Sequence, residues 1–197
     1  VNPAYHPSLD PQAIRHGIVF GDGAKHIQTP GNGRKEFCQI YLCNDPNGCD
    51  SRTLAPYFTD SGYKPVDRPD VGQVRFYGLP VTWKSLPDTL DPSYLRGFIA
   101  GWFAADGSIS GDGQCTLSCA VKENLEWLQV VAPIAGLAVS TRIVDGEWEG
   151  AFGSGICYTL GISKDTVDED FFVMAAKRSR YSTAKHKKYW VIRSVRR

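Results

Sequence analysis

The most apolar stretch of the chain, Tyr94–Ser108, predicts a helix with large side chains on one face and almost none on the other. The large residues recur at helical spacing, and glycine or alanine fills the positions between them. Glycine costs about 1 kcal/mol relative to alanine inside a helix, so Gly97 and Gly101 need a structural reason. The close approach of a second helix would supply that reason.

An internal repeat predicts the second helix. Leu9-Asp10-Pro11 and Leu90-Asp91-Pro92 each place aspartate at an N-cap and proline at the first helical position. The helices that follow would span about 11–20 and 92–104, the second being longer, and both end in Asp-Gly. Small residues recur four positions apart in both. We expect the helices to pack around a pseudo-twofold axis, with these residues at the contact: Gly17, Gly21, Gly101 and Ala105.

The remaining pattern predicts two similar halves, 1–88 and 89–197, and an α+β fold. In the first half we expect strands at 37–43, 63–66 and 73–77, a short helix at 51–59, a polar loop at 24–35 and a helical turn around Trp83 and Lys84. In the second half we expect a glycine-rich turn at 107–113, strands at 115–121, 139–144 and 156–162, a glycine-rich loop at 146–155, and helices at 123–131 and 167–178.

Each of the two repeated helices, which we call the motif helices, ends in an aspartate, Asp22 or Asp106. A helix C-terminus carries unpaired carbonyl groups and partial negative charge, so an added carboxylate there makes a site for a hard divalent cation. If the helices pack side by side, both carboxylates reach the same end, where metal ions could bind a phosphate and activate water. The alternative is that each Asp-Gly is only a turn after a helix. The matching second copy favours the metal site.

At this point the sequence resembles a known family. Gly17–Gly23 and Gly101–Gly107 resemble two copies of the LAGLIDADG motif of homing endonucleases. The resemblance implies two αββαββα halves, with the motif helices at their interface and a saddle of antiparallel sheets over DNA. It implies a monomeric, site-specific double-strand DNA endonuclease with a long, degenerate, roughly pseudo-palindromic target.

The resemblance also implies a cofactor. Mg²⁺ is expected, with Mn²⁺ as a second option, held by Asp22 and Asp106 together with Gly21 and Ala105. Ca²⁺ is expected to support DNA binding without efficient cleavage, because its looser coordination orients the attacking water poorly.

Many members of the family place a lysine near each metal, late in each half. Lys185 or Lys187 comes at about that distance after Asp106, and Lys84 is the nearest lysine in the first half. Polar side chains on the free face of the sheets, as in the alternating segment 38–42, are expected to read base edges in the major groove. The expected DNA contacts are Lys25, Arg34, Lys35, Gln39, Tyr41, Arg75, Arg142 and Lys188.

The segment 188–195 resembles the point at which the endonuclease insert of an intein rejoins its splicing domain. The chain starts with neither Cys nor Ser and has no terminal His-Asn pair, so we expect the endonuclease part of an intein without splicing activity.

Composition and charge fit this interpretation. The formal net charge is +1, but 177–197 holds nine of the 22 basic residues and no acidic one, which favours a segment that faces phosphates. No run approaches a membrane span and the start does not resemble a signal peptide, so we expect a soluble intracellular protein, cytoplasmic in a bacterial or phage-infected cell. The six cysteines form no CxxC pair, which favours free thiols over zinc.

Two alternatives stay open. One is a non-cleaving nucleic-acid binder or RNA maturase on the same scaffold. The other is a fold in which the paired helices merely join two half-domains. The presence of both aspartates argues against each, and a metal-dependent cleavage assay separates all three.

Overall fold

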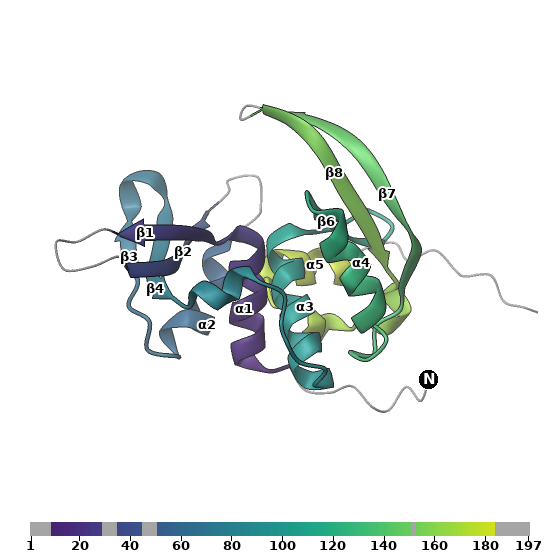
Figure 1. Cartoon of the computed structure of the whole chain (residues 1–197), viewed down its shortest axis with the longest axis horizontal. Coiled ribbons are helices and arrows are strands. Elements are labelled where there is room, and N and C mark those ends of the chain that lie inside the picture. The colour runs from purple at the N-terminus through teal and green to yellow at the C-terminus, as the bar shows by residue number, and fades with distance from the viewer. Residues whose placement is uncertain (1–8, 29–34, 45–50, 151–152, 184–197) are drawn as a thin grey trace, which may run out of the picture.

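The computed structural model describes residues 9–28, 35–44, 51–150 and 153–183. Within these residues, two four-stranded antiparallel sheets lie on either side of a central pair of helices, α1 and α3 (Figure 1). The strand orders are β1-β2-β4-β3 and β5-β6-β8-β7, so the two sheets repeat one topology. The α+β class is therefore confirmed.

The elements follow one another in the same order in both halves. The first half contains α1 (Pro11–Asp22), β1 (Ala24–Gln28), β2 (Lys35–Cys43), α2 (Ala55–Thr59), β3 (Val66–Arg68), β4 (Gln73–Leu79) and the 3₁₀ helix η3 (Val81–Lys84). The second contains α3 (Pro92–Asp106), β5 (Gly107–Ile109), β6 (Cys115–Cys119), α4 (Lys122–Val131), β7 (Val139–Gly150), β8 (Gly153–Ile162) and α5 (Ala175–Thr183). The short η3 in the first half follows β4 as α5 follows β8.

The two motif helices begin as the sequence predicts. The Asp10 carboxylate accepts hydrogen bonds from the backbone N–H groups of Gln12 and Ala13, at 2.7 and 3.1 Å. The Asp91 carboxylate accepts one from Tyr94 N at 2.7 Å. Helix α1 has 12 residues and α3 has 15, so α3 is the longer helix, as expected.

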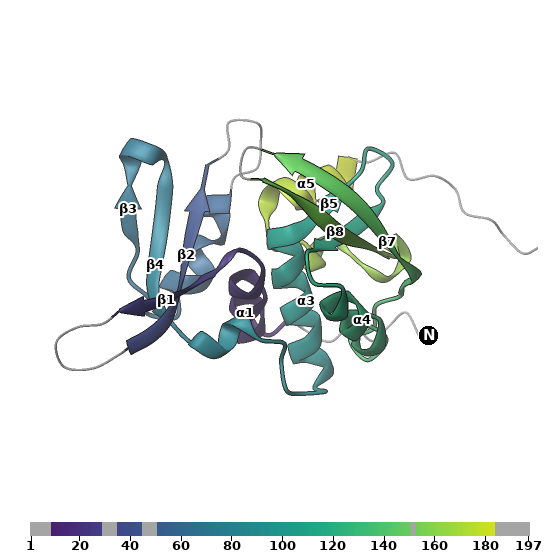
Figure 2. The same cartoon turned by 45° about the horizontal axis from the view of Figure 1, so that its top comes forward.

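The helices touch through their backbones. A methyl group on Gly17 would overlap the carbonyl oxygen of Phe98, and one on Gly101 would overlap the carbonyl oxygen of Ile14. The contact is reciprocal, because Gly17 and Ile14 in α1 occupy the places that Gly101 and Phe98 occupy in α3. Figure 2 shows the two helices side by side between the sheets.

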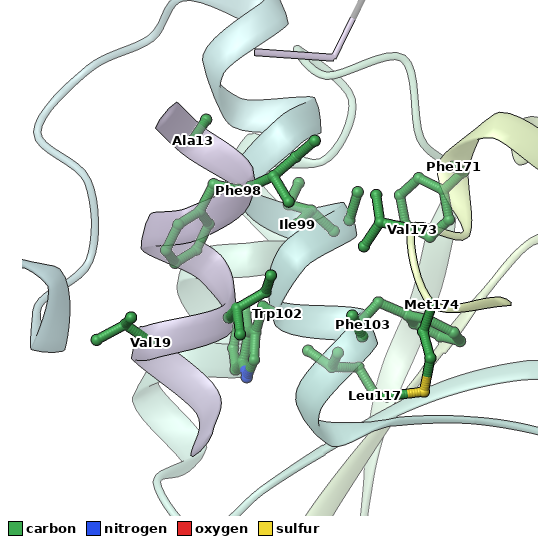
Figure 3. Close-up of a cluster of buried hydrophobic side chains, with 14 of the residues drawn as sticks. Ala13, Val19, Phe98, Ile99, Trp102, Phe103, Leu117, Phe171, Val173 and Met174 are labelled. Carbon is green, nitrogen blue, oxygen red and sulfur yellow. The ribbon is translucent and has the colours of Figure 1, made fainter. Parts of the chain in front are cut away.

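A hydrophobic core surrounds this contact. Helix α3 is buried along most of its length, from Leu95 to Ala104. Figure 3 shows Phe98, Ile99, Trp102 and Phe103 of this helix directed into a cluster that α1 enters from one side and the segment before α5 from the other. The sheets cover the outer flanks of the pair and hold its position.

The structure differs from the sequence predictions in its short strands. Strand β3 covers Val66–Arg68 rather than 63–66, because these are the residues that pair with β4. Two other strands form where none was predicted. Residues 24–28 form β1 rather than a loop, and pair in register with β2 from Ala24↔Gln39 to Gln28↔Lys35. Residues 107–109 form β5 rather than a turn, and pair with β6. Neither segment is long or apolar enough for its sequence to predict a strand. Each becomes a strand because it pairs with a neighbouring strand in the folded chain.

The glycine-rich loop predicted at 146–155 is also wrong. Strand β7 runs to Gly150 and β8 begins at Gly153, and the two pair over a long stretch in which Glu147 lies opposite Ile156 and Gly146 opposite Cys157 (Figure 1). The closing helix begins at Ala175 rather than 167, because short 3₁₀ turns and the buried segment Phe171–Met174 come first. Among the described residues, no helix combines the length and the apolar character that a membrane span requires.

Candidate metal centre

The aspartates at the ends of α1 and α3 lie together. A methyl group on Gly21 would overlap Ala105 Cβ and would lie 3.0 Å from Asp106 Oδ2. The tight helix contact therefore brings the end of α1 against the carboxylate of α3. Asp22 is exposed to solvent, whereas Asp106 is half-buried.

Desolvation and neighbouring charges change the acidity of both aspartates. Desolvation by the surrounding protein and then repulsion from Asp106 raise the pKa of Asp22 to about 6, although Lys177 and Lys84 oppose this change. Burial also raises the pKa of Asp106, against a hydrogen bond from Trp102 and the same two lysines. The Asp22 side chain keeps its contact with solvent, through which a proton or a metal ion would reach it.

A lysine is bonded to the C-terminal end of each helix. Lys84 Nζ donates to the carbonyl oxygens of Phe20 and Gly21, at 2.5 and 3.2 Å. Lys177 Nζ donates to the carbonyl oxygens of Phe103, Ala104 and Ala105, at 2.8, 2.7 and 3.3 Å. Each ammonium group thus offsets the negative end of a helix and the adjacent carboxylate.

Lys177 did not emerge from the sequence as a site residue. Lys185 and Lys187, which were expected to support the second metal, lie outside the described residues. One signal was present: Lys177 closely follows the apolar run 171–174 near the end of its half, much as Lys84 follows Val81 and Trp83. Lys84 does lie beside the first motif helix.

The donor groups fit a hard divalent cation. Two carboxylates face the end of the helix pair, and the carbonyl oxygens of Gly21 and Ala105 keep a second lone pair beside their lysine bonds. Mg²⁺ is usually held by one or two carboxylates, with water and substrate phosphate oxygens completing its shell. Within the part of the chain that the structure describes, no three His, Cys, Asp or Glu side chains form a metal-binding group.

Beside Asp106 is a cavity of about 520 Å³ that both halves line. The first half contributes Phe20, Gly21 and Lys84, and the second half contributes Trp102, Asp106, Ser118–Val121, Asn124 and Cys157. Five cysteines of the described residues are free thiols; Cys38 and Cys115 are buried, whereas Cys43, Cys119 and Cys157 are half-buried.

The first sheet presents polar and aromatic side chains on its face away from the helices. Cys38, Ile40 and Leu42 are buried, which places Gln39 and Tyr41 on that free face, as predicted. Arg75 pairs with Tyr41 across β2 and β4. Its guanidinium lies 4.5 Å from the centre of the Tyr41 ring, and its Nε and Nη2 donate to Gln73 Oε1 at 3.0 and 2.8 Å.

Two further expected contacts lie elsewhere on the sheets. Lys25 pairs with Cys38, so the register places it on the helix-facing side of β1. Arg142 is exposed on β7, where the register with β8 is irregular. Arg34 and Lys188, and the side chain of Lys35, lie outside what the structure describes.

The free face of the second sheet has a different chemistry. Ser108 and Thr116 share a hydrogen bond of 2.9 Å between their hydroxyl groups. Ser118 and Thr159 share another of 3.2 Å. This face therefore carries a row of hydroxyl groups where the first sheet carries an arginine and aromatic rings.

Two pseudo-symmetric α+β halves, joined through a glycine-packed pair of helices that end in aspartate, define the LAGLIDADG fold. No protein-family model matches the chain, and no curated protein matches it in sequence. Among solved structures it is similar to I-DmoI in complex with DNA and Ca, with a TM-score of 0.52, 15% identity, and coverage of 79% of this chain and 83% of that chain.

A variant of I-DmoI in complex with its target DNA in the presence of Mn gives a TM-score of 0.51 at 14% identity, covering 89% of this chain and 93% of that chain. A structure from work on mesophilic variants of the homing endonuclease I-DmoI also gives 0.51 at 14% identity, with 86% and 95% covered. Identities this low establish the fold alone. The chain has the LAGLIDADG fold, as its two motifs predicted.

Proposed function

We propose that the protein is a site-specific double-strand DNA endonuclease that hydrolyses phosphodiester bonds with a divalent metal ion. The observation that carries the proposal is the meeting of Asp22 and Asp106 at one end of the helix pair, with a lysine bonded to each helix end. A pair of helices that only joined two half-domains would gain nothing from acidic groups placed against the negative ends of both helices.

In this proposal Asp22 and Asp106, with the carbonyl oxygens of Gly21 and Ala105, hold Mg²⁺ or Mn²⁺. A bound metal ion would polarise a phosphate and lower the pKa of a water molecule. Lys84 and Lys177 fix the helix-end carbonyl groups and keep positive charge close to the arriving phosphate. The solvent contact of Asp22 leaves a path for the substrate.

The two sheets would contact the two halves of a long, roughly pseudo-palindromic target. Arg75, Gln39 and Tyr41 supply charge, amide and aromatic groups on the first sheet, whereas the second supplies the hydroxyl groups of Ser108, Thr116, Ser118 and Thr159. The chain would act as a monomer of two halves, 1–88 and 89–197, since one chain supplies both aspartates. The basic segment 177–197 would contact phosphates.

Origin within an intein is part of the same proposal. The I-DmoI structures, described as complexes with DNA and Ca or Mn, support the choice of partner and metal class.

The experiment is a selection for cleaved molecules from a large library of random duplex DNA, with Mg²⁺ present. Sequencing the cut ends would give both the target and the cut register. Asp22→Asn and Asp106→Asn should each abolish cleavage of that target while leaving its binding intact, since binding depends mainly on phosphate and base contacts. Ca²⁺ should permit binding without efficient cutting.

Cleavage by both Asn variants would refute the metal centre. Enrichment of a bound sequence without any cutting by the wild-type protein would replace the proposal with the non-cleaving binder. Binding to structured RNA in preference to duplex DNA would instead indicate a maturase.

A further inference from the structure

The two motif helices differ at one position close to the metal centre. Gly17 and Gly101 are equivalent in the repeat, so Trp102 in α3 occupies the place of Ile18 in α1. Trp102 Nε1 donates a hydrogen bond of 2.9 Å to Asp106 Oδ2, one turn further along the helix. Ile18 has no polar hydrogen and offers nothing comparable to Asp22.

The indole ring is held on several sides. It is fully buried. The Phe20 ring of the opposite helix meets it edge to face, with the ring centres 4.9 Å apart, and Phe98 lies on the side of the preceding turn. Figure 3 shows the ring between the two helices, with its nitrogen directed toward their C-terminal ends. The backbone carbonyl of Phe20 also accepts a hydrogen bond from Lys84. Phe20 therefore links the indole ring to the lysine at the end of α1.

A purely structural explanation exists, because a buried indole N–H generally needs an acceptor. The choice of acceptor argues for more. A backbone carbonyl would satisfy the N–H equally well, but the bond goes to a carboxylate that lines the cavity between the two halves. A bond from a neutral donor takes one carboxylate oxygen and fixes the direction of the other.

We propose that Trp102 is a positioning residue for Asp106: its indole N–H holds Oδ2 and leaves Oδ1 as the oxygen that would bind a metal ion. The two metal-binding aspartates are then unequal: Asp106 is held in place before the metal arrives, whereas Asp22 is exposed and has no tryptophan behind it. The inference rests on the proposed metal centre. It predicts that the Asp106 side of the centre binds a divalent ion more tightly than the Asp22 side.

Groups that orient a metal ligand from behind change metal affinity by about 10- to 100-fold when they are removed. We expect Trp102→Phe to weaken Mn²⁺ binding about 10-fold at the tighter site, because it keeps most of the ring and removes the N–H. Binding at the weaker site should stay unchanged. Trp127→Phe is the matched control, since Trp127 is half-buried on α4 and packs edge to face on Phe98, away from both carboxylates.

The first measurement is the titration of Mn²⁺ into the full chain without DNA, with free Mn²⁺ read by electron paramagnetic resonance. The second is the indole N–H resonance of Trp102 in isotope-labelled protein, assigned from triple-resonance spectra of the wild-type chain. That resonance should move on Mg²⁺ addition and in Asp106→Ala, and should stay in place in Asp22→Ala. These wild-type and alanine spectra decide the question even if Trp102→Phe does not fold.

Unchanged Mn²⁺ affinity in a folded Trp102→Phe protein would overturn the inference, and so would an indole resonance insensitive to both Mg²⁺ and Asp106→Ala. A wild-type protein that binds no Mn²⁺ would overturn it as well. A protein that cuts no DNA but still binds Mn²⁺ and shifts its indole resonance on Mg²⁺ addition would support the inference about Trp102. That result would contradict only the proposed endonuclease activity.

Discussion

Replacing Gly101 with alanine tests whether the two halves depend on backbone contact between the helices. The new methyl group would overlap the carbonyl oxygen of Ile14 and lie 3.0 Å from the Ile18 nitrogen. Both atoms belong to the backbone of α1, so no flexible side chain can yield, and the helices must move apart. Overpacking of a tight core costs about 1–3 kcal/mol. Because the contact is with backbone atoms, we expect the cost of Gly101→Ala to lie at the upper end of this range.

Alanine also favours the helix by about 1 kcal/mol over glycine. The net loss of unfolding free energy should therefore be about 2 kcal/mol, or about 4–8 °C in the melting temperature of a chain of this size. Gly101→Leu should cost more, and Gly17→Ala should resemble Gly101→Ala, because its methyl group would overlap Phe98 O. The cleavage rate should fall by more than the loss of folded protein explains, because separating the helices moves Asp22 away from Asp106.

The assay is urea unfolding followed by circular dichroism, with midpoint and slope compared between variants. Gly146→Ala is the control, because nothing lies within 4 Å of its added methyl group and no positive φ demands glycine there. A Gly101→Ala protein as stable as wild type would refute the backbone contact. An equal loss in Gly146→Ala would show that the effect is not specific to the helix pair.

Further substitutions test the site and the sheets. Lys177→Met should lower the cleavage rate by about 100-fold or more, as when one preorganised electrostatic donor is removed; Lys122→Met, which alters an exposed ion pair on α4, should leave it unchanged in the same gel assay. Arg75→Ala should lower the slope of log K against log salt by about 1, measured by fluorescence anisotropy, if its guanidinium contacts a phosphate; an unchanged slope would exclude that contact. His16 is buried between the Ser85 carbonyl and the Tyr94 hydroxyl, and burial lowers its pKa below 6.5. Its contribution to stability is therefore present above about pH 6.5 and lost as the pH falls below it, so thermal melts of His16→Gln should show a smaller loss between neutral and acidic pH than wild type. Asp22→Asn should stabilise the protein above about pH 6, where ionisation of Asp22 opposes folding: the shift in its pKa corresponds to about 3 kcal/mol in full, which solvent screening of this exposed group reduces to roughly 1 kcal/mol, and equal melting temperatures at pH 8 would contradict this.

The centre of the fold was predictable because its signals are local and repeated. Aspartate and proline mark both helix starts, small residues mark the contact, and Asp-Gly marks both ends. The alternation of Cys38, Ile40 and Leu42 likewise predicts which face of β2 is buried. In each case the physical requirement lies within a few residues of its cause.

The features that sequence could not predict depend on partners far along the chain. Strand β1 exists because β2 lies beside it, and the long β7–β8 hairpin overrides glycines that usually indicate a turn. Lys177 reaches the end of α3 from more than 70 positions away, with bonds that only the folded chain brings together. The hydrogen bond from Trp102 to Asp106 joins residues only four positions apart, but the sequence does not reveal it because it depends on the rotamers of both side chains.

The stability of the helix pair and the chemistry of its ends oppose each other. An acidic group at a helix C-terminus is unfavourable, and here two of them meet. Desolvation, and then repulsion from Asp106, raise the pKa of Asp22. Lys84 and Lys177 offset part of this cost from segments that close the two halves. If the helices only joined the halves, asparagine at both positions would keep the helix ends and remove the repulsion. Local conflict of this kind is expected where a site has a function, because function requires what folding alone would not favour. The paired aspartates are therefore the strongest argument for metal-dependent chemistry in this molecule.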